Sequence, residues 1–506
     1  MRVIRPWFAA LALTMLAAQA PALARNDALP PAVREALTAA AVPPEALTAI
    51  IMPLQGLSRR WERDADRPMQ PGSTMKLVTS IVALERLGPN LRGRTELLSS
   101  ARVENEVLQG DLVLRGGADP ELGWPQLLAL FNELRDQGVR EIAGDILLDR
   151  SLFRPARLDV GLAPFDDAPE FYYNVIPDAL GLTGHLMGLE LKSDAETVSL
   201  RTLPRLDGIE LRSAFTLVDR RCGEWASGWQ PAGVQDDGSR IVIELRGSFP
   251  RHCTQRPELQ LIDRDRLAAF TLRSLWQRLG GSWQGQLREG QAAPDARLLA
   301  RRLARPWGEV LRPLNKQSDN ALTRLLYLQL GAQALQPPSA AAGTAAPQPL
   351  ADAASMTTLQ AAEAEVRRWL AERRIDSSGF VIDNGSGLSR TERLSARQLA
   401  LMLKHALEGP NAADLLMSLP TVGVDGTMRL RLKTSPAAGW ARLKTGTLRN
   451  VVALAGVVHD ERRRPSIFVA IINHENASRA RPALDALVDW VARGRPAPAV
   501  GRMGEP

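Results

Sequence analysis

Ser73-Thr74-Met75-Lys76 follows Pro71-Gly72 and opens a predicted helix that ends at Gly88-Pro89. Apolar residues recur along this helix at helical spacing: Met75, Val78, Ile81, Val82 and Leu87. Because Lys76 stands three residues after Ser73, the two side chains lie on one helix face, one turn apart. The stretch therefore predicts a serine nucleophile beside an amine. The alternative is that Ser73 only caps the helix and Lys76 points to solvent.

Lysine is rare in this chain. Six lysines stand against 57 arginines, out of 63 basic residues in a chain of 506. Three of the six lie at short polar motifs: Lys76, Lys316 just before Ser318-Asp319-Asn320, and Lys444, which opens Lys444-Thr445-Gly446. Where arginine fills the ordinary basic positions, a retained lysine indicates work that arginine cannot do, such as losing its proton when buried.

The second and third motifs contain groups that acyl transfer needs. Ser318 could pass a proton to a leaving amine, and Asn320 could hold an amide. Lys444, with the hydroxyl groups of Thr445 and Thr447, could bind a carboxylate, while Gly446 would let a substrate backbone approach closely. Each motif also has a structural alternative, because Ser, Asp and Asn commonly cap helices and a lysine can stand exposed at a strand entry.

The order Ser-x-x-Lys, Ser-Asp-Asn, Lys-Thr-Gly is typical of penicillin-binding proteins and serine β-lactamases. With its long insertion between the first two motifs, the chain resembles the low-molecular-mass class C penicillin-binding proteins, the D-alanyl-D-alanine carboxypeptidase/endopeptidase family. Two further strings carry the resemblance: Asp383-Asn384-Gly385-Ser386-Gly387-Leu388-Ser389-Arg390 and Val424-Asp425-Gly426-Thr427.

The resemblance implies an α+β fold of the penicillin-binding transpeptidase/β-lactamase type, with a central antiparallel sheet flanked by helices and a large inserted β-rich α+β region. It implies a peptidoglycan stem-peptide substrate, acylation by β-lactam antibiotics and no cofactor. Ser73 is then the acylated serine and Lys76 its base, and the backbone N–H groups of Ser73 and Thr447 form the oxyanion hole. The remaining motif residues follow by position: Ser318 and Asn320 form the second motif, and Lys444, Thr445 and Gly446 the third.

Tyr172-Tyr173-Asn174 competes for the role of second motif, because Tyr-x-Asn serves another branch of penicillin-interacting enzymes. This segment lies inside the β-rich insertion, whereas Ser318-Asp319-Asn320 lies in a helical block with Lys316 beside it. We therefore assign the second motif to Ser318-Asp319-Asn320 and expect the two tyrosines to pack within the insertion.

The order of predicted elements divides the chain into four parts. Residues 1–24 are read as a secretory signal, 25–94 as the first part of the catalytic domain, 95–302 as an inserted region of two small domains, and 303–506 as the second catalytic part. The apolar runs Val451–Val458 and Ile467–Ile472 predict a hairpin after the third motif. The Ala/Pro-rich stretch Gln333–Met356 predicts a flexible surface loop.

Export to the periplasm follows from the predicted signal, whose apolar run is too short and too close to Pro21 for a membrane anchor. No later segment predicts a membrane span. In an oxidising compartment Cys222 and Cys253 are expected to pair, and the five scattered histidines predict no metal site. The net charge of +7 comes from dispersed arginines, without the basic stripe of a nucleic-acid binder.

Three other functions compete with a DD-peptidase. Serine β-lactamases share the chemistry, but they are shorter and lack the 242 positions that here separate Lys76 from Ser318. A non-catalytic cell-wall-binding protein would have little reason to keep all three motifs. An esterase of the lipase type is disfavoured, because Gly385-Ser386-Gly387 lacks the Gly-x-Ser-x-Gly spacing.

Overall fold

The computed structural model describes residues 29–55, 60–336 and 353–494. The predicted signal over residues 1–24 lies outside these ranges, as does most of the predicted loop Gln333–Met356. Among the described residues, no helix combines the length and the apolar character needed to cross a membrane.

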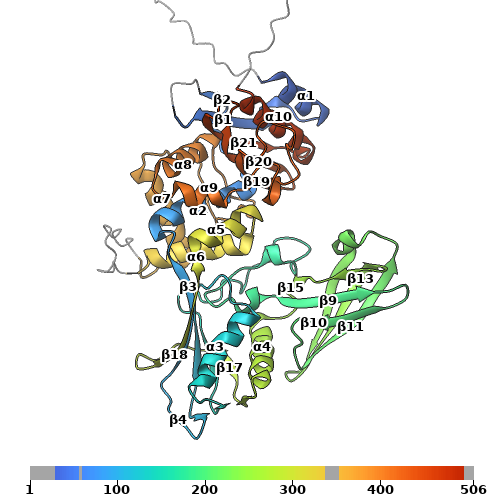
Figure 1. The fold of residues 1–506 in the computed structure, drawn as a ribbon, viewed down its shortest axis with the longest axis vertical. Helices are drawn as coiled ribbons and strands as arrows, with labels where there is room; N and C mark the ends of the chain where they lie inside the picture. Colours follow the sequence, from blue (N-terminus) through green and yellow to red (C-terminus); the bar gives the residue numbers. More distant parts are fainter. Residues whose placement is uncertain (1–28, 56–59, 337–352, 495–506) are drawn as a thin grey trace, which may run out of the picture.

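A five-stranded antiparallel sheet in the order β19-β20-β21-β1-β2 forms the centre of the catalytic part (Figure 1). The predicted hairpin is confirmed, since β20 pairs with β21 along its whole length. The strands are β1 Leu47–Pro53, β2 Trp61–Arg63, β19 Arg442–Leu448, β20 Val451–His459 and β21 Pro465–Asn473.

Both faces of this sheet are buried, which explains the unbroken apolar runs in β20 and β21. Along β21, Ile467, Val469 and Ile471 pack into the cluster that contains helix α2. Phe468, Ala470 and Ile472 point to the opposite face, into the cluster formed with α1 and α10. Because side chains alternate along a strand, a sheet covered on both sides requires apolar residues at every position.

Helices flank the sheet on both faces, as the resemblance implied. Helices α1 and α10 cover one face, and α2 with α5 to α9 lie on the other (Figure 1). Their bounds are α1 Pro31–Ala39, α2 Met75–Leu87, α5 Trp307–Lys316, α6 Asn320–Ala334, α7 Thr358–Glu372, α8 Ala396–Glu408, α9 Ala412–Ser418 and α10 Arg481–Ala492.

The inserted region begins with a second five-stranded sheet, in the order β17-β8-β6-β3-β18, and helices α3 and α4 pack with it (Figure 1). β18 runs to Pro306, past the predicted join at 302, and α5 begins directly after it at Trp307. The elements are β3 Arg92–Ser99, β4 Val103–Glu104, β5 Val107–Leu108, β6 Leu112–Gly117, α3 Trp124–Asp136, β7 Glu141–Ile142, β8 Ile146–Asp149, α4 Arg264–Arg278, β16 Ser282–Trp283, β17 Leu287–Glu289 and β18 Arg297–Pro306.

The rest of the insertion is β-rich and has its own apolar cluster. β9 Met187–Ser193 pairs with β10 Val198–Thr202, β14 Thr254–Gln255 and β15 Glu258–Leu259. Beside them, β13 Ile241–Pro250 lies between β11 Ile209–Val218 and β12 Trp229–Asp236. The predicted pairing of Cys222 with Cys253 is present as a disulfide, which ties the turn before β12 to the end of β13.

The predicted joins of the insertion, residues 95 and 302, lie opposite each other, because Thr95 pairs with Arg302 in the β3–β18 ladder. The chain therefore enters and leaves the insertion on neighbouring strands. Among the described residues, three apolar clusters lie wholly within the insertion, while Ala118, Phe153, Leu158 and Ala179 of the insertion pack into the cluster that contains α2. The division of the chain at 95 and 302, and of the insertion into two small domains, stays a prediction that these features support.

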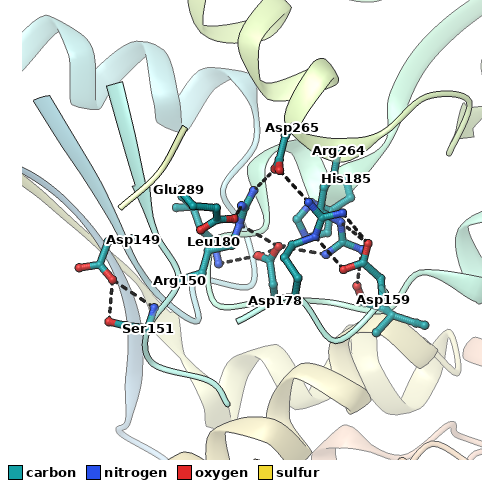
Figure 2. A network of polar contacts seen from close by, with 12 residues as sticks. Asp149, Arg150, Ser151, Asp159, Asp178, Leu180, His185, Arg264, Asp265 and Glu289 are labelled. Carbon is teal, nitrogen blue, oxygen red and sulfur yellow. Dashed lines mark hydrogen bonds and ion pairs between the residues drawn. The ribbon is translucent and has the colours of Figure 1, made fainter. Parts of the chain in front are cut away.

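A buried ion network anchors the loop between β8 and β9 (Figure 2). Arg150 and Asp178 are both fully buried, with Arg150 Nε 3.0 Å from Asp178 Oδ2. Arg264 on α4 donates to the same carboxylate at 3.0 Å, and Asp265 accepts from Arg150 at 2.6 Å. Burial alone would raise the pKa of Asp178, but His185, Arg150 and Arg264 outweigh it and hold that pKa well below its ordinary value. The loop fixed in this way carries Tyr172–Asn174.

Candidate active site

Ser73 lies in a short 3₁₀ turn, Gly72–Thr74, that leads directly into α2. The predicted helix therefore exists, although its α-helical part begins at Met75 rather than at Ser73. Lys76 is fully buried and its Nζ lies 3.1 Å from Ser73 Oγ. The alternative in which Lys76 points to solvent is wrong, because the helix places its side chain beneath the sheet edge, against the other motifs.

Three oxygen atoms surround the Lys76 ammonium, and none belongs to a carboxylate. Besides Ser73 Oγ, Nζ donates to Asn320 Oδ1 at 2.6 Å and to the Ser386 carbonyl oxygen at 2.5 Å. Burial lowers the pKa of Lys76 to about 7, although the carboxylates of Glu392 and Asp319 act in the opposite direction. Lys76 can therefore exist as a neutral amine near neutral pH, which a base requires.

The string Asp383–Arg390 supplies the Ser386 carbonyl, a contact that sequence reasoning did not assign. Its loop is held from beneath by Glu392, a fully buried carboxylate. Glu392 Oε1 accepts the backbone N–H groups of Asp383, Asn384 and Gly385 at 3.2, 3.2 and 2.9 Å. Burial raises the pKa of Glu392 to about 7. No sequence signal separates this glutamate from exposed ones, because its burial depends on the fold of the loop.

Ser318-Asp319-Asn320, the predicted second motif, lies between the other two: Asn320 contacts Lys76 and Ser318 contacts Lys444. Asp319 caps α6 by accepting the Leu322 N–H at 2.9 Å, so the helix-capping role that the sequence offered as an alternative is present at this residue. Asn320 bridges two parts of the molecule: Oδ1 accepts from Lys76, and Nδ2 donates to the Tyr173 carbonyl oxygen at 3.0 Å.

The competing segment Tyr172–Asn174 therefore reaches the site through its backbone. The Asn174 side chain turns away, donating to Asp166 and to the Ala168 carbonyl oxygen. Packing of the tyrosines within the insertion is only part of their role, because Tyr172 also lines a cavity of about 750 Å³ beside Asp319. This cavity lies between α6 and the insertion and is large enough for part of a peptide substrate.

Lys444, the first residue of the third motif, faces Ser318. Lys444 is fully buried on β19 and donates to Ser318 Oγ at 2.8 Å. Burial lowers the pKa of Lys444 well below its usual range, and repulsion from Lys76 adds to the effect. The positive charge of Arg324 adds to the effect of burial in lowering the pKa of Lys76. Thr445 Oγ1 bonds Thr427 Oγ1 at 2.8 Å, which links the string Val424–Thr427 to the motif.

Gly446 permits close contact with the start of α2. A Cβ at Gly446 would lie 2.5 Å from the Pro71 carbonyl oxygen and 3.2 Å from Thr74 N. The sequence predicted that Gly446 lets a substrate backbone approach closely. In the structure, the segment that lies against Gly446 is the start of the protein's own helix α2. Gly72, with φ +52°, lies correspondingly close to Thr447, since an added Cβ would be 3.1 Å from Thr447 N. The Ser73 turn and the Thr447 backbone are therefore neighbours, as an oxyanion hole between them requires.

Lys316, the third lysine singled out in the sequence, forms an ion pair with Asp425. Asp425 also accepts the Thr421 N–H at 2.7 Å, so the pair fixes the loop that carries Thr427. Arginine could form such a pair as well, so the composition argument holds for Lys76 and Lys444, which are buried, and not for Lys316.

The chain matches the D-Ala-D-Ala carboxypeptidase 3 (S13) family over residues 31–494. The chain belongs to this family. It is a serine-type D-Ala-D-Ala carboxypeptidase, and the predictions of family, fold class and DD-peptidase function are confirmed.

Two relatives show the extent of the similarity. The chain is 26% identical over 413 residues to a D-alanyl-D-alanine carboxypeptidase DacB of Haemophilus influenzae, covering 80% of each chain. It is 27% identical over 456 residues to a D-alanyl-D-alanine carboxypeptidase of Actinomadura, covering 88% of this chain and 81% of that protein. The crystal structure of penicillin binding protein 4 from Haemophilus influenzae shares the fold, with a TM-score of 0.70 and 23% identity over 90% of this chain and 99% of that one.

Proposed function

We propose that Ser73 is the nucleophile of a DD-peptidase and that Lys76 removes its proton. The observation that carries this proposal is the position of Lys76 Nζ, 3.1 Å from Ser73 Oγ and surrounded only by neutral oxygen acceptors. With a pKa of about 7, Lys76 supplies a neutral amine at working pH, within hydrogen-bond distance of the serine whose proton it accepts.

Acylation follows from this arrangement. Ser73 Oγ attacks the carbonyl carbon between two D-alanine residues while its proton passes to Lys76. The tetrahedral oxyanion accepts hydrogen bonds from the backbone N–H groups of Ser73 and Thr447, which the Gly72–Thr447 contact brings together. Collapse of the intermediate breaks the peptide bond and leaves an ester on Ser73.

Departure of the amine uses the second and third motifs. The leaving nitrogen takes a proton from Ser318 Oγ, and Lys444, hydrogen-bonded to that oxygen, replaces it. The terminal carboxylate of the substrate supplies the negative charge that buried Lys444 lacks, and so favours its protonated form. Asn320 keeps Lys76 in place and presents its amide near the peptide. Before deacylation, Lys76 releases the proton it took from Ser73 to solvent, and Lys444 regains one from solvent. Water then attacks the ester carbonyl and gives a proton to neutral Lys76, which passes it to Ser73 Oγ as the ester bond breaks.

The substrate class follows from the family: peptidoglycan stem peptides, either as free carboxypeptides or as DD-cross-links, in the periplasm. The cavity of about 750 Å³ beside Asp319 gives room for a peptide longer than the two D-alanines. β-Lactams would acylate Ser73 in the same pose. In support, the Haemophilus influenzae relative has been crystallised with a bound β-lactam.

Labelled penicillin tests these assignments. After incubation, peptide mapping should find a long-lived penicilloyl ester on Ser73, and Ser73→Ala should abolish labelling. Label on another residue, or none on folded protein that cleaves a D-Ala-D-Ala peptide, would refute the catalytic assignment. Release of the label within seconds would favour the β-lactamase alternative. A protein that neither binds penicillin nor cleaves the peptide would fit the non-catalytic alternative.

A further inference from the structure

A hollow of about 560 Å³ lies on the outer face of the sheet formed by β11, β13 and β12. Short side chains form its floor at outward positions: Thr216 and Ser248, which are paired in the register of β11 and β13, and Ala214, whose partner Arg246 also lines the hollow. The opposite face of β13 carries Ile243 and Leu245 into the apolar core. In Figure 1 these strands lie at the far edge of the insertion, away from β19 and α2.

Arg220 reaches into this hollow and is held by hydroxyl groups rather than by a carboxylate. It donates to Ser227 Oγ at 3.0 Å and to Ser248 Oγ at 3.3 Å. No carboxylate in the described parts of the chain lies within ion-pair distance of it. Nearby acidic side chains are engaged elsewhere: Asp219 accepts from Arg251 at 3.2 Å and Glu244 from Arg246 at 2.7 Å.

The surrounding backbone fixes the position of Arg220. Gly228 leaves room for it, because a Cβ at Gly228 would lie 2.7 Å from Arg220 Nη1 and 2.2 Å from Ser248 Oγ. Gly247, at φ +109°, lets the turn approach β13, since a Cβ there would lie 2.1 Å from the Gly228 carbonyl oxygen. The Cys222–Cys253 disulfide ties the same turn to the end of β13. The guanidinium is thus pre-organised by contacts that leave its charge unbalanced.

We infer that this hollow binds a carboxylate of the peptidoglycan polymer, at a site separate from the one that cleaves it. A guanidinium binds carboxylates with a geometry that lysine cannot match, and the hydroxyl groups of Thr216, Ser227 and Ser248 can bond adjacent polar groups. Stem peptides repeat along the polymer and end in carboxylates, so one stem can occupy Arg220 while another reaches Ser73. This inference rests on the proposed peptidoglycan substrate.

Co-sedimentation with purified insoluble peptidoglycan at low salt tests the site, in full-length protein carrying Ser73→Ala so that the polymer stays intact. Arg220→Gln should weaken binding about tenfold, the loss of one charge-assisted contact. Thr216→Glu should weaken it similarly, because it places a carboxylate in the hollow. Arg212→Gln is the matched control: Arg212 is exposed on β11, bonds Glu210 at 2.6 Å and does not line the hollow, so binding should be unchanged.

Two further arms identify the ligand chemistry. Peptidoglycan whose carboxylates have been amidated should bind Arg220→Gln and the parent equally weakly. Vesicles of phosphatidylglycerol should bind both proteins alike. Equal binding of Arg220→Gln and the parent to unmodified peptidoglycan would overturn the inference, as would no binding by the parent, or a loss confined to the vesicles.

Cleavage of a soluble D-Ala-D-Ala peptide, measured with Ser73 intact, separates this site from the proposed function. Arg220→Gln and Thr216→Glu should cleave the peptide at the parent rate and keep the parent's thermal midpoint. If the parent fails to cleave the peptide, the proposed function is wrong whatever Arg220 does. If cleavage is normal and polymer binding does not depend on Arg220, only the inference of a carboxylate-binding site at Arg220 is wrong.

Discussion

Lys76 in the catalytic part and Arg150 in the insertion are both fully buried cationic side chains, and their surroundings differ. Arg150 is surrounded by the carboxylates of Asp178, Asp265 and Glu289. Within the described part of the chain, Lys76 donates to a hydroxyl, an amide oxygen and a carbonyl oxygen. Burial opposes both charges, but the carboxylates raise the pKa of Arg150, whereas burial lowers the pKa of Lys76 to about 7.

The difference separates a buried charge held by ion pairs from one that can lose its proton near neutral pH. Arginine keeps its proton under all working conditions, so a buried arginine must be neutralised by partners and then holds chain segments together. Lysine can lose its proton, so a buried lysine without adjacent carboxylates becomes a base. Each of these residues can be tested by a substitution that removes the property assigned to it: proton release at Lys76 and positive charge at Arg150.

The largest effect is expected at Lys76→Arg. Arginine preserves the positive charge and approximate reach, but its pKa above about 12 leaves no neutral form to accept the Ser73 proton. Loss of a general base costs about 10²–10⁴-fold, so penicillin acylation and peptide cleavage should both fall at least about a hundredfold. Stopped-flow measurement of the acylation rate checks this prediction.

Lys404→Arg is the control for this exchange, because Lys404 pairs with Glu408 on the surface of α8. Its acylation rate should equal that of the parent. If folded Lys76→Arg acylates within a few-fold of the parent, Lys76 is not the base and serves only as a charge.

Arg150→Met should destabilise the insertion. It removes one partner of the buried Asp178 carboxylate, and breaking a buried pair costs about 3–5 kcal/mol. We expect the free energy of unfolding to fall by about 3 kcal/mol, the low end of this general range, because Arg264 remains 3.0 Å from Asp178. Urea unfolding, followed by the fluorescence of the insertion's tryptophans, measures the change.

Arg288→Met provides the comparison for Arg150. Arg288 is half-exposed and pairs with Asp145 at 2.6 Å on the surface, where such pairs contribute less than about 1 kcal/mol. Equal losses of unfolding free energy for the two variants would contradict the structural role assigned to the buried network.

Glu392→Gln should give the smallest effect, a shift in the pH dependence of acylation. The carboxylate of Glu392 raises the pKa of Lys76, so its removal lowers that pKa. Acylation, which requires neutral Lys76, rises with pH through a midpoint near 7 in the parent. This midpoint should move down by about one pH unit in the variant.

Glutamine can still accept the three backbone N–H groups of the loop, so the Ser386 carbonyl should keep its place. Glu408→Gln, at an exposed position, should leave the midpoint unchanged. A Glu392→Gln midpoint at or above that of the parent would show that Glu392 does not act on Lys76 through its charge.

Much of the fold and the candidate site could be predicted from local pattern. The apolar runs of β20 and β21 predicted a buried hairpin, because a strand covered on both faces needs apolar residues throughout. The distribution of lysines identified Lys76 and Lys444. The same argument over-interpreted Lys316, since composition carries no information on whether an amine is buried or faces Asp425.

Residues that act through distant contacts could not be predicted. The backbone of Tyr173 meets Asn320 across 147 positions of sequence, and Ser386 meets Lys76 across 310. Glu392 acts from a buried position that no local pattern distinguishes. Gly446 was assigned to the substrate, whereas the structure places Pro71 against it, because the packing of β19 on the start of α2 is a tertiary contact.

The sequence by itself determined the family, the order of the three motifs and the chemical groups available for acyl transfer, because these depend on residue identity and on spacing within one helix or strand. Only the tertiary structure decided which of those groups are buried and can change protonation near neutral pH. Burial and the neighbouring charges set the protonation of Lys76, Lys444 and Glu392, and both are properties of the packed chain rather than of any segment within it.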